Sequence, residues 1–425
     1  MELVVFLGSL VVFLFLGIPI ALGLVLCAIT LMIFSGDGDF MIIPQAMVDG
    51  VNNYPLMAIP FFVFAGEIMA KGGLSKRVVL LSQLIIGRVK GGLGYATIVA
   101  SVIFAGLMGS SVGEAAALMG ILYPMMKDAG YDSGRAGGVI ASGAILGPII
   151  PPSANFILLG ATMGLSITKL FMIGLVPGLL IGVFLLIMWF FIVRKDGYTE
   201  TITFTRAQAV QIIKESMPAF MLPVILLGGI RFGVFTPTEG GAFAAVYAIV
   251  VCCFYYRELT LRDLLKVSTT AARTTAVVMF IVGTATAVGW FITSAQIPMQ
   301  MAEFFGPLVD SPRLLLVAIM IFLFAAGMVM DLTPNILLFA PVFYPLILQA
   351  GVDPYFFGLL FVLNVGLGVI TPPVGTVLFV VAGSAEISLG YLVRKMAPFF
   401  LMEVAVLFLL LFFPTLSLTP LKWLM

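Results

Sequence analysis

The chain has no histidine, only three cysteines and few charged residues. Histidine is absent from its 425 residues, and Asp, Glu, Lys and Arg together make up 10% of the sequence. Without histidine the chain lacks the commonest proton relay, general base and metal ligand, so little supports an enzymatic function. Cys27, Cys252 and Cys253 lie in apolar segments without the spacing of a metal site or a disulfide framework. We interpret them as packing residues, and we expect no organic cofactor.

Runs of basic residues and long polar stretches are also missing. The net charge is +1, and no Lys/Arg run is long enough to suggest nucleic-acid binding. Hydrophobic residues make up 62% of the chain, far above their share in soluble domains. Because a membrane-spanning helix needs about 20 apolar residues, the apolar segments predict an all-α polytopic membrane protein with about 11 segments in the lipid bilayer. The first, at 3–34, has no cleavage site and should be retained.

The chain contains one ungapped internal repeat. Segment 109–153 corresponds to 330–374, because Tyr123 and Tyr344, Gly130 and Gly351, and Pro151 and Pro372 are each 221 positions apart. Pro-Pro pairs and polar residues inside apolar sequence, present twice at one offset, are typical of transporters built from two structural halves.

Charged loops orient these halves. Basic residues gather at 71–90, 127–135, 194–195, 257–266 and 394–395, which the positive-inside rule places in the cytoplasm. Segment 92–127 lies between two such loops, so we predict a re-entrant helical hairpin with its tip at 109–113. Segment 314–348 is flanked by acidic or mixed segments, so it should enter and leave on the outer side, with its tip at 331–334. An acidic segment with Asp37, Asp39 and Asp49 should also face outward, and the two repeats are therefore inverted.

Segments 136–163 and 356–383 each carry a Pro-Pro pair near the middle. Since proline lacks an N–H and clashes with the preceding turn, we predict two crossing helices that are each broken around an unwound segment. Unwound backbone at membrane depth must be covered, so tips and breaks should meet in pairs at the midplane. Residues 196–216 form a polar linker, in which Ala207–Ser216 is expected to lie along the cytoplasmic surface. Trp189 and Trp423, near the ends of apolar segments, fit interface anchors.

Tips and breaks expose carbonyl and hydroxyl oxygens, which suit an alkali cation better than a transition metal. We predict about two Na+ sites, one in each half. The first would use Ser110, Ser111, Gly113, Gly147, Ile150 and Pro152, and the second Asp331, Thr333, Pro334, Gly368, Thr371 and Pro373.

The half-helices also direct their N-terminal ends at the midplane, where they attract anions. The candidate substrate-binding residues are Ser153, Asn155, Asn335, Thr376 and Glu114. A structural role is the alternative for each, because Ser and Thr in membrane helices often bond to their own backbone, and Glu114 or Asp331 could simply cap a half-helix. A carboxylate at membrane depth is nevertheless costly and is seldom retained without a role.

Six motifs follow one another along nearly the whole chain. They are IPFFVFAGEIM at 59–69, GSSVGEAAALMGILYPMMKDAGYD at 109–132, GPIIPPS at 147–153, GVFTPTEGGA at 233–242, MDLTPNILLFAPVFYPL at 330–346 and ITPPVG at 370–375. Together they resemble the large membrane subunit of tripartite ATP-independent periplasmic (TRAP) transporters. From the chain length we expect a stand-alone large subunit, without a fused four-helix small subunit before the first motif.

The resemblance implies a sodium-driven secondary transporter of a bacterial inner membrane. Its implied partners are a small four-helix membrane subunit and a periplasmic binding protein that captures an organic acid, such as a dicarboxylate, sialic acid or a sugar acid. The implied fold is that of divalent-anion/sodium symporters. A scaffold would comprise 1–90 and 195–311, and a transport domain of 91–194 and 312–425 would slide as an elevator.

Other functions remain open at this stage. A related symporter that needs no binding protein would transport its substrate with this chain alone. A passive channel would not accumulate solute. A membrane-embedded enzyme would need a nucleophile, base or metal cluster, which a histidine-free chain hardly offers.

Overall fold

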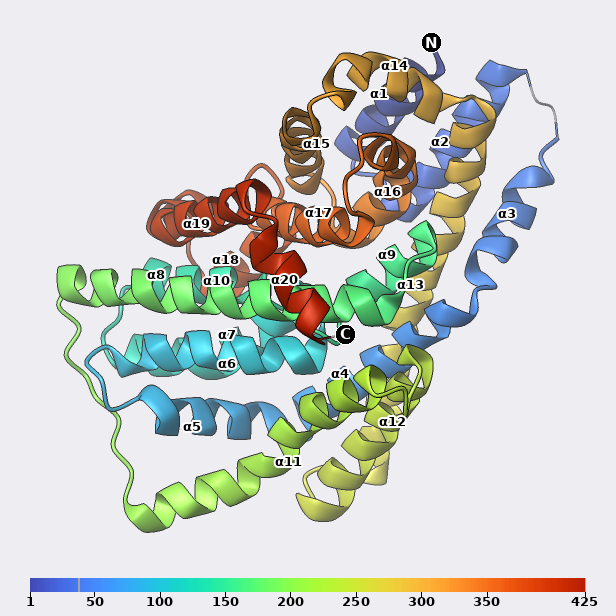
Figure 1. Ribbon diagram of the computed structural model, residues 1–425. Helices are drawn as coiled ribbons and strands as arrows, with labels where there is room; N and C mark the ends of the chain where they lie inside the picture. The colour runs from blue at the N-terminus through green and yellow to red at the C-terminus, as the bar shows by residue number, and fades with distance from the viewer. Residues whose placement is uncertain (37–38, 425) are drawn as a thin grey trace.

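The computed structural model describes residues 1–36 and 39–424, so Asp37 lies outside the described residues. Every regular element in these ranges is a helix (Figure 1). Seven of the described helices are long and apolar enough to cross a membrane: Tyr54–Lys71, Ile167–Asp196, Arg206–Arg231, Pro237–Tyr255, Leu261–Ser294, Leu332–Gln349 and Leu389–Phe412. The chain is therefore an all-helical, multi-pass membrane protein, as the sequence predicts.

The first apolar segment contains two helices, separated at Gly17-Ile18-Pro19 because Gly17 has a positive φ and proline disfavours a helical residue before it. The helices of the N-terminal region are α1 (Glu2–Phe15), α2 (Ile20–Ser35), α3 (Ile42–Val51), the 3₁₀ turn η1 (Tyr54–Met57), α4 (Ala58–Lys71) and α5 (Leu74–Ile86).

The helix boundaries reproduce the internal repeat. Adding 221 to the bounds of α7 (Ser111–Asp128) gives the bounds of α16 (Leu332–Gln349). The helices α6 (Gly92–Met108) and α7 form one hairpin, and α15 (Pro312–Gly327) and α16 form the other. Both hairpins lie where the sequence predicts them. We still only predict that each hairpin enters and leaves the membrane on the same side.

Both segments with Pro-Pro pairs are broken as predicted, and that each crosses the membrane stays a prediction. The first consists of α8 (Ser133–Ala144) and α9 (Ala154–Met163), and the second of α17 (Pro354–Gly368) and α18 (Thr376–Ala385). Each is followed by a longer helix, α10 (Ile167–Asp196) or α19 (Leu389–Phe412). A last helix, α20 (Thr415–Leu424), packs on α10 (Figure 1).

The linker between the halves leads into a long helix. A capping box formed by Thr205 and Gln208 starts α11, which runs without interruption from Arg206 to Arg231. Ala207–Ser216 is therefore the first part of this helix, and its place along the cytoplasmic surface stays a prediction. The chain continues through α12 (Pro237–Ile249), a π-helical turn η2 (Val250–Tyr255), α13 (Leu261–Ser294) and α14 (Ile297–Val309).

Trp189 is not an interface anchor. Its side chain is fully buried, its indole N–H donates to the Gly91 carbonyl at 3.0 Å, and it stacks on Tyr131, Tyr198 and Phe399. The interpretation from sequence fails because neighbouring helices cover this end of α10. Trp423 on α20 is 76% exposed, in agreement with an anchor role.

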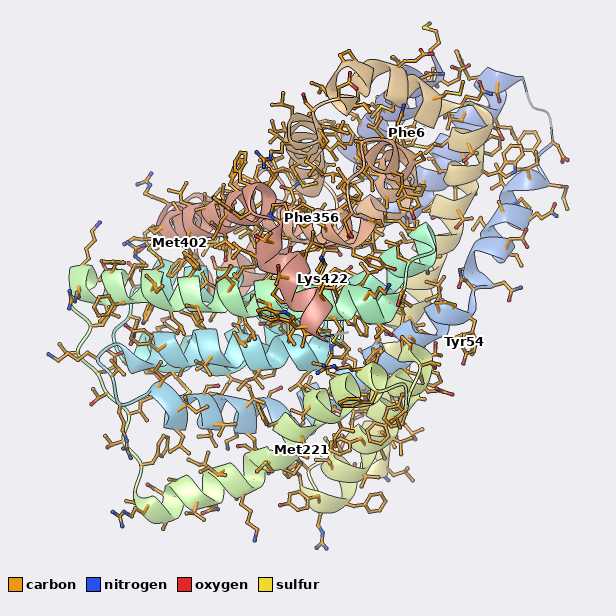
Figure 2. All side chains as sticks on the ribbon, viewed as in Figure 1. Phe6, Tyr54, Met221, Phe356, Met402 and Lys422 are labelled. Carbon is orange, nitrogen blue, oxygen red and sulfur yellow. The ribbon has the colours of Figure 1, made fainter. Side chains whose placement is uncertain are left out.

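The two repeats pack across each other. The second arm of each hairpin contacts the second half of the other repeat's broken helix: α7 packs on α18, and α16 packs on α9. The helices α1–α5 and α11–α14 pack largely on one another. Among them, α2 and α3 pack on α13, and α4 packs on α12 (Figure 1). Side chains fill the spaces between helices in Figure 2, where Phe356 of α17 is buried and Met221 of α11 is 39% exposed.

Candidate functional site

The first hairpin turns within two residues. Gly109 ends α6 with a φ of +62°, in the left-handed region that glycine adopts without strain. The next residue, Ser110, caps α7, and its hydroxyl accepts a hydrogen bond from the Gly113 N–H at 3.4 Å. Ser110 and Gly113 are exposed, whereas Ser111 is buried. The tip therefore presents one hydroxyl outward and one inward.

This tip lies directly against the break of its own repeat. A methyl group added at Gly109 would lie 2.9 Å from the carbonyl oxygen of Pro152. One added at Gly147 would lie 2.9 Å from a carboxylate oxygen of Glu114 and 3.1 Å from the carbonyl carbon of Ser110. The structure thus brings together tip and break residues that the sequence predicts to meet.

Several oxygens at this contact have few partners in the described part of the chain. The Ser111 hydroxyl is buried without a hydrogen bond, and the buried carboxylate of Glu114 has only the Ser101 hydroxyl beside it. Buried polar groups are normally paired, so these atoms are suited to a bound cation or water. Ser153 differs, because its hydroxyl donates to the Pro148 carbonyl at 2.6 Å and accepts from Phe156 N–H. It caps α9, and Asn155 follows it at 9% exposure.

Helix α10 covers the first break. A methyl group at Gly174 would collide with the Ile149 carbonyl, and one at Gly178 would collide with the Ile150 side chain. The unwound backbone is therefore shielded by protein, as membrane depth requires.

The second tip and break are joined by backbone hydrogen bonds. The Met328 carbonyl accepts from the N–H groups of Val374 and Gly375 at 3.2 and 3.3 Å. A methyl group at Gly327 would lie 3.2 Å from the Cα of Gly368. The tip spans 328–331, so Thr333 and Pro334 belong to the first turn of α16 and not to the tip. Proline is well tolerated in a first turn because its missing N–H is not needed there.

The candidate residues of the second repeat differ in their hydrogen bonds and in their burial. Asp331 precedes α16 without a side-chain capping bond. The Thr371 hydroxyl donates to the Leu367 carbonyl at 2.7 Å, so only its lone pairs are free. The Thr376 hydroxyl is buried and unpaired among the described residues. Thr333 is half-buried, and Pro373 is exposed beside the break.

Asn335 stabilises the second tip. Its amide nitrogen donates to the carbonyls of Met330 and Asp331, both at 2.9 Å, while its side-chain oxygen is buried without a described partner. The amide donors are therefore already used, and only the oxygen is left for a ligand.

Sequence reasoning missed two features. Glu403 of α19 is fully buried, and the Ser142 hydroxyl of α8 lies close enough to its carboxylate to form a hydrogen bond. A single acidic residue inside the apolar segment 396–418 was the available signal. The second feature is a cavity of about 540 Å³ between α3, α13, α9 and α16. It unites distant segments, so no local pattern could indicate it.

Comparison with known proteins agrees with this architecture. Residues 7–416 match the family described as "Tripartite ATP-independent periplasmic transporter, DctM component". The 2,3-diketo-L-gulonate TRAP transporter large permease protein YiaN of Escherichia coli is 45% identical, over 100% of both chains. The sialic acid TRAP transporter large permease protein SiaM of Vibrio cholerae is 34% identical over 95% of both.

Solved structures support the fold alone. The YdaH transporter of Alcanivorax borkumensis superposes with a TM-score of 0.65 at 14% identity, covering 86% of each chain. MtrF of Neisseria gonorrhoeae gives 0.59 at 12% identity, covering 87% of this chain and 84% of its own. The family match spans nearly the whole sequence and agrees with the repeated tips and breaks, so the chain belongs to the DctM family, the large permease component of tripartite ATP-independent periplasmic transporters.

Proposed function

We propose that the chain is the permease of a sodium-coupled system that takes up an organic acid across a bacterial inner membrane. The observation that carries this proposal is the doubled contact between hairpin tip and helix break. In each repeat, backbone carbonyls and polar side chains come together at this contact. It is formed by Gly109 and Pro152 in the first repeat and by Gly327 and Gly368 in the second. Paired sites of this kind would let two cations bind with one solute, and the gradient of the cation would then drive uptake.

The sodium sites would use oxygens of the tip and of the break. In the first repeat these are the Ser111 hydroxyl, which has no hydrogen bond among the described residues, the Ser110 hydroxyl, which accepts from the Gly113 N–H, and carbonyls at 147–152. In the second they are the Asp331 carboxylate, the Thr371 lone pairs and carbonyls near Gly368. Hard oxygen ligands without a tetrahedral arrangement favour an alkali cation.

The relatives support an organic acid as the substrate class. They are named for 2,3-diketo-L-gulonate, for sialic acid and for isethionate. The N-terminal ends of α9 and α18, with Asn155 and Thr376 beside them, would attract the carboxylate of such a solute.

We infer two partners from the family name and one relative. A tripartite periplasmic transporter requires a soluble binding protein and a second membrane subunit besides the permease. The isethionate TRAP transporter permease protein DctMQ of Oleidesulfovibrio alaskensis is 34% identical over 96% of this chain and 64% of its own length, which leaves room for a fused small subunit.

Transport would proceed by elevator motion of 91–194 and 312–425 against 1–90 and 195–311. The cavity between α3 and α13 on one side and α9 and α16 on the other lies along that boundary. Sliding along it would move both tips and both breaks as one unit, because they pack on each other across the repeats.

Reconstitution tests the proposal. The chain is placed in proteoliposomes with the small subunit and binding protein that co-purify with it, and uptake of the binding protein's ligand is followed with and without an inward sodium gradient. We expect accumulation only with sodium and all three proteins. Uptake by this chain alone would instead support a symporter without a binding protein.

A further inference from the structure

The cavity between the two groups of helices reaches the helix that follows the second hairpin tip. Its lining includes Leu337 and Pro341 of α16, which follow Asn335 of the same helix by two and six positions. It continues to Thr293, near the C-terminal end of α13. Its volume of about 540 Å³ is within the usual range of pockets for small ligands.

Polar groups on the cavity wall are mostly hydrogen-bond acceptors. Three threonine hydroxyls on the wall donate hydrogen bonds to carbonyls of their own helices at 2.8–2.9 Å: Thr162 to Leu158, Thr286 to Val282 and Thr293 to Gly289. Because their protons are used in this way, these hydroxyls present only lone pairs to the cavity. The carboxylate of Asp49 also only accepts. Asn53 and Trp290 supply the N–H donors, and the lining contains no Lys or Arg.

Asp49 is held at this wall by its neighbour. A methyl group at Gly50 would collide with the side chain of Thr286, so the backbone of α3 lies directly on α13 here. Asp49 is exposed, and among the described residues its carboxylate takes part in no ion pair and no side-chain hydrogen bond. An unpaired negative charge in a cavity used by anions opposes a second negative charge nearby.

We propose that this cavity binds the hydroxyl-bearing, uncharged end of a polyhydroxy monocarboxylate and that Asp49 excludes dicarboxylates. The inference rests on the proposed function as an organic-acid permease. Solute hydroxyls donate to Asp49 and to the threonine oxygens, while the exposed ring of Trp290 offers an apolar face to the C–H groups of the chain. The solute's single carboxylate then points away from Asp49, toward the tips.

A matched pair of acids tests this selectivity. D-Gluconate and D-glucarate differ only at C6, which is a hydroxymethyl group in the first and a carboxylate in the second; D-galactonate and D-galactarate form a second pair. Binding to the full chain, purified with its small subunit in sodium-containing detergent buffer, is measured as ligand-dependent thermal stabilisation. We expect the monocarboxylate of at least one pair to bind at least ~10-fold more tightly than its dicarboxylate. Adipate, a dicarboxylate without hydroxyls, should bind more weakly still.

The variant Asp49→Asn removes the charge and keeps the shape. In this variant the affinity for the monocarboxylate should exceed the affinity for the dicarboxylate of the same pair by about threefold or less. The change should come chiefly from tighter binding of the dicarboxylate. Asp310→Asn, an exposed position outside the cavity lining, is the control and should leave the ratio unchanged.

Three outcomes overturn the inference: an unchanged ratio in Asp49→Asn, dicarboxylates that bind as tightly as their partners, or no stabilisation by either monocarboxylate. The proposed function is assayed separately, as sodium-driven uptake of the binding protein's ligand. Uptake of a dicarboxylate as efficient as that of its monocarboxylate partner would refute the inference alone, whereas the absence of any sodium-dependent uptake would refute the proposed function.

Discussion

Gly327 and Gly368 pack backbone against backbone, with no room for a side chain between them. A methyl group at Gly368 would lie 2.5 Å from the carbonyl carbon of Gly327, far inside van der Waals contact. This contact holds the second hairpin tip on the second break, next to the hydrogen bonds that Met328 accepts from Val374 and Gly375. The position of the tip therefore depends on one pair of glycines.

Gly368→Ala should abolish sodium-dependent uptake by separating tip and break. Gly366→Ala is the matched control, because it lies on the same helix and nothing is within 4 Å of its added methyl group. In the helix interior this control should be neutral or stabilising by up to ~1 kcal/mol. Uptake in proteoliposomes and the melting temperature are measured for both variants. Equal uptake by the two would contradict the role assigned to the contact.

The proposed sodium sites predict separable effects in the two repeats. Asp331→Asn removes the carboxylate proposed for the second site, and Ser110→Ala removes a hydroxyl proposed for the first. We expect Asp331→Asn to weaken apparent sodium affinity at least ~10-fold, and Ser110→Ala to weaken it less, because a charged ligand contributes more than a neutral hydroxyl. The measurement is uptake as a function of sodium concentration. If both variants keep the sodium dependence of the unaltered protein, the ligand assignment is wrong.

Asn335 yields a test of tip stability that does not depend on transport. Its amide donates two hydrogen bonds to the tip carbonyls of Met330 and Asp331. Asn335→Asp replaces both donors with acceptors facing carbonyl oxygens and should destabilise the fold by roughly 1–3 kcal/mol. Thermal unfolding in detergent without sodium measures this loss. Thr376→Val, at a hydroxyl that makes no hydrogen bond in the described residues, should have a much smaller effect on unfolding.

Much of this arrangement could be predicted from the sequence because it depends on local rules. Both proline pairs interrupt a helix, and the need to cover unwound backbone at membrane depth predicts that tips meet breaks. The capping box that begins α11 depends on the hydroxyl and amide geometry of Thr205 and Gln208, and a count of apolar residues does not reveal it. The burial of Trp189 and the wall around Asp49 depend on helices that are distant in sequence. Such contacts leave no periodic signal, so they had to come from the structure.

Asp132 makes the ends of α8 and α19 sensitive to pH. Burial raises the pKa of its carboxyl, but hydrogen bonds from Tyr391 and Lys395, at 2.5 and 3.1 Å, outweigh burial and hold that pKa below its ordinary value of 3.8. Because the pKa is lower in the folded protein, this carboxylate stabilises the fold fully above pH 3.8 and loses that contribution as the pH falls through the folded-state pKa.

Asp132→Asn should therefore lower the melting temperature at neutral pH, and the difference from the unaltered protein should shrink as the pH falls below about 4. Melting curves in detergent between neutral and strongly acidic pH measure this convergence. Asp353→Asn is the matched control, because Asp353 caps α17 at the corresponding place in the second repeat, where no described ion pair involves it. A constant difference between Asp132→Asn and the unaltered protein across this range would mean that the aspartate acts through packing and not through its charge. Convergence confined to Asp132→Asn would assign the effect to the Lys395 and Tyr391 contacts, since both aspartates cap a helix but only Asp132 has these partners.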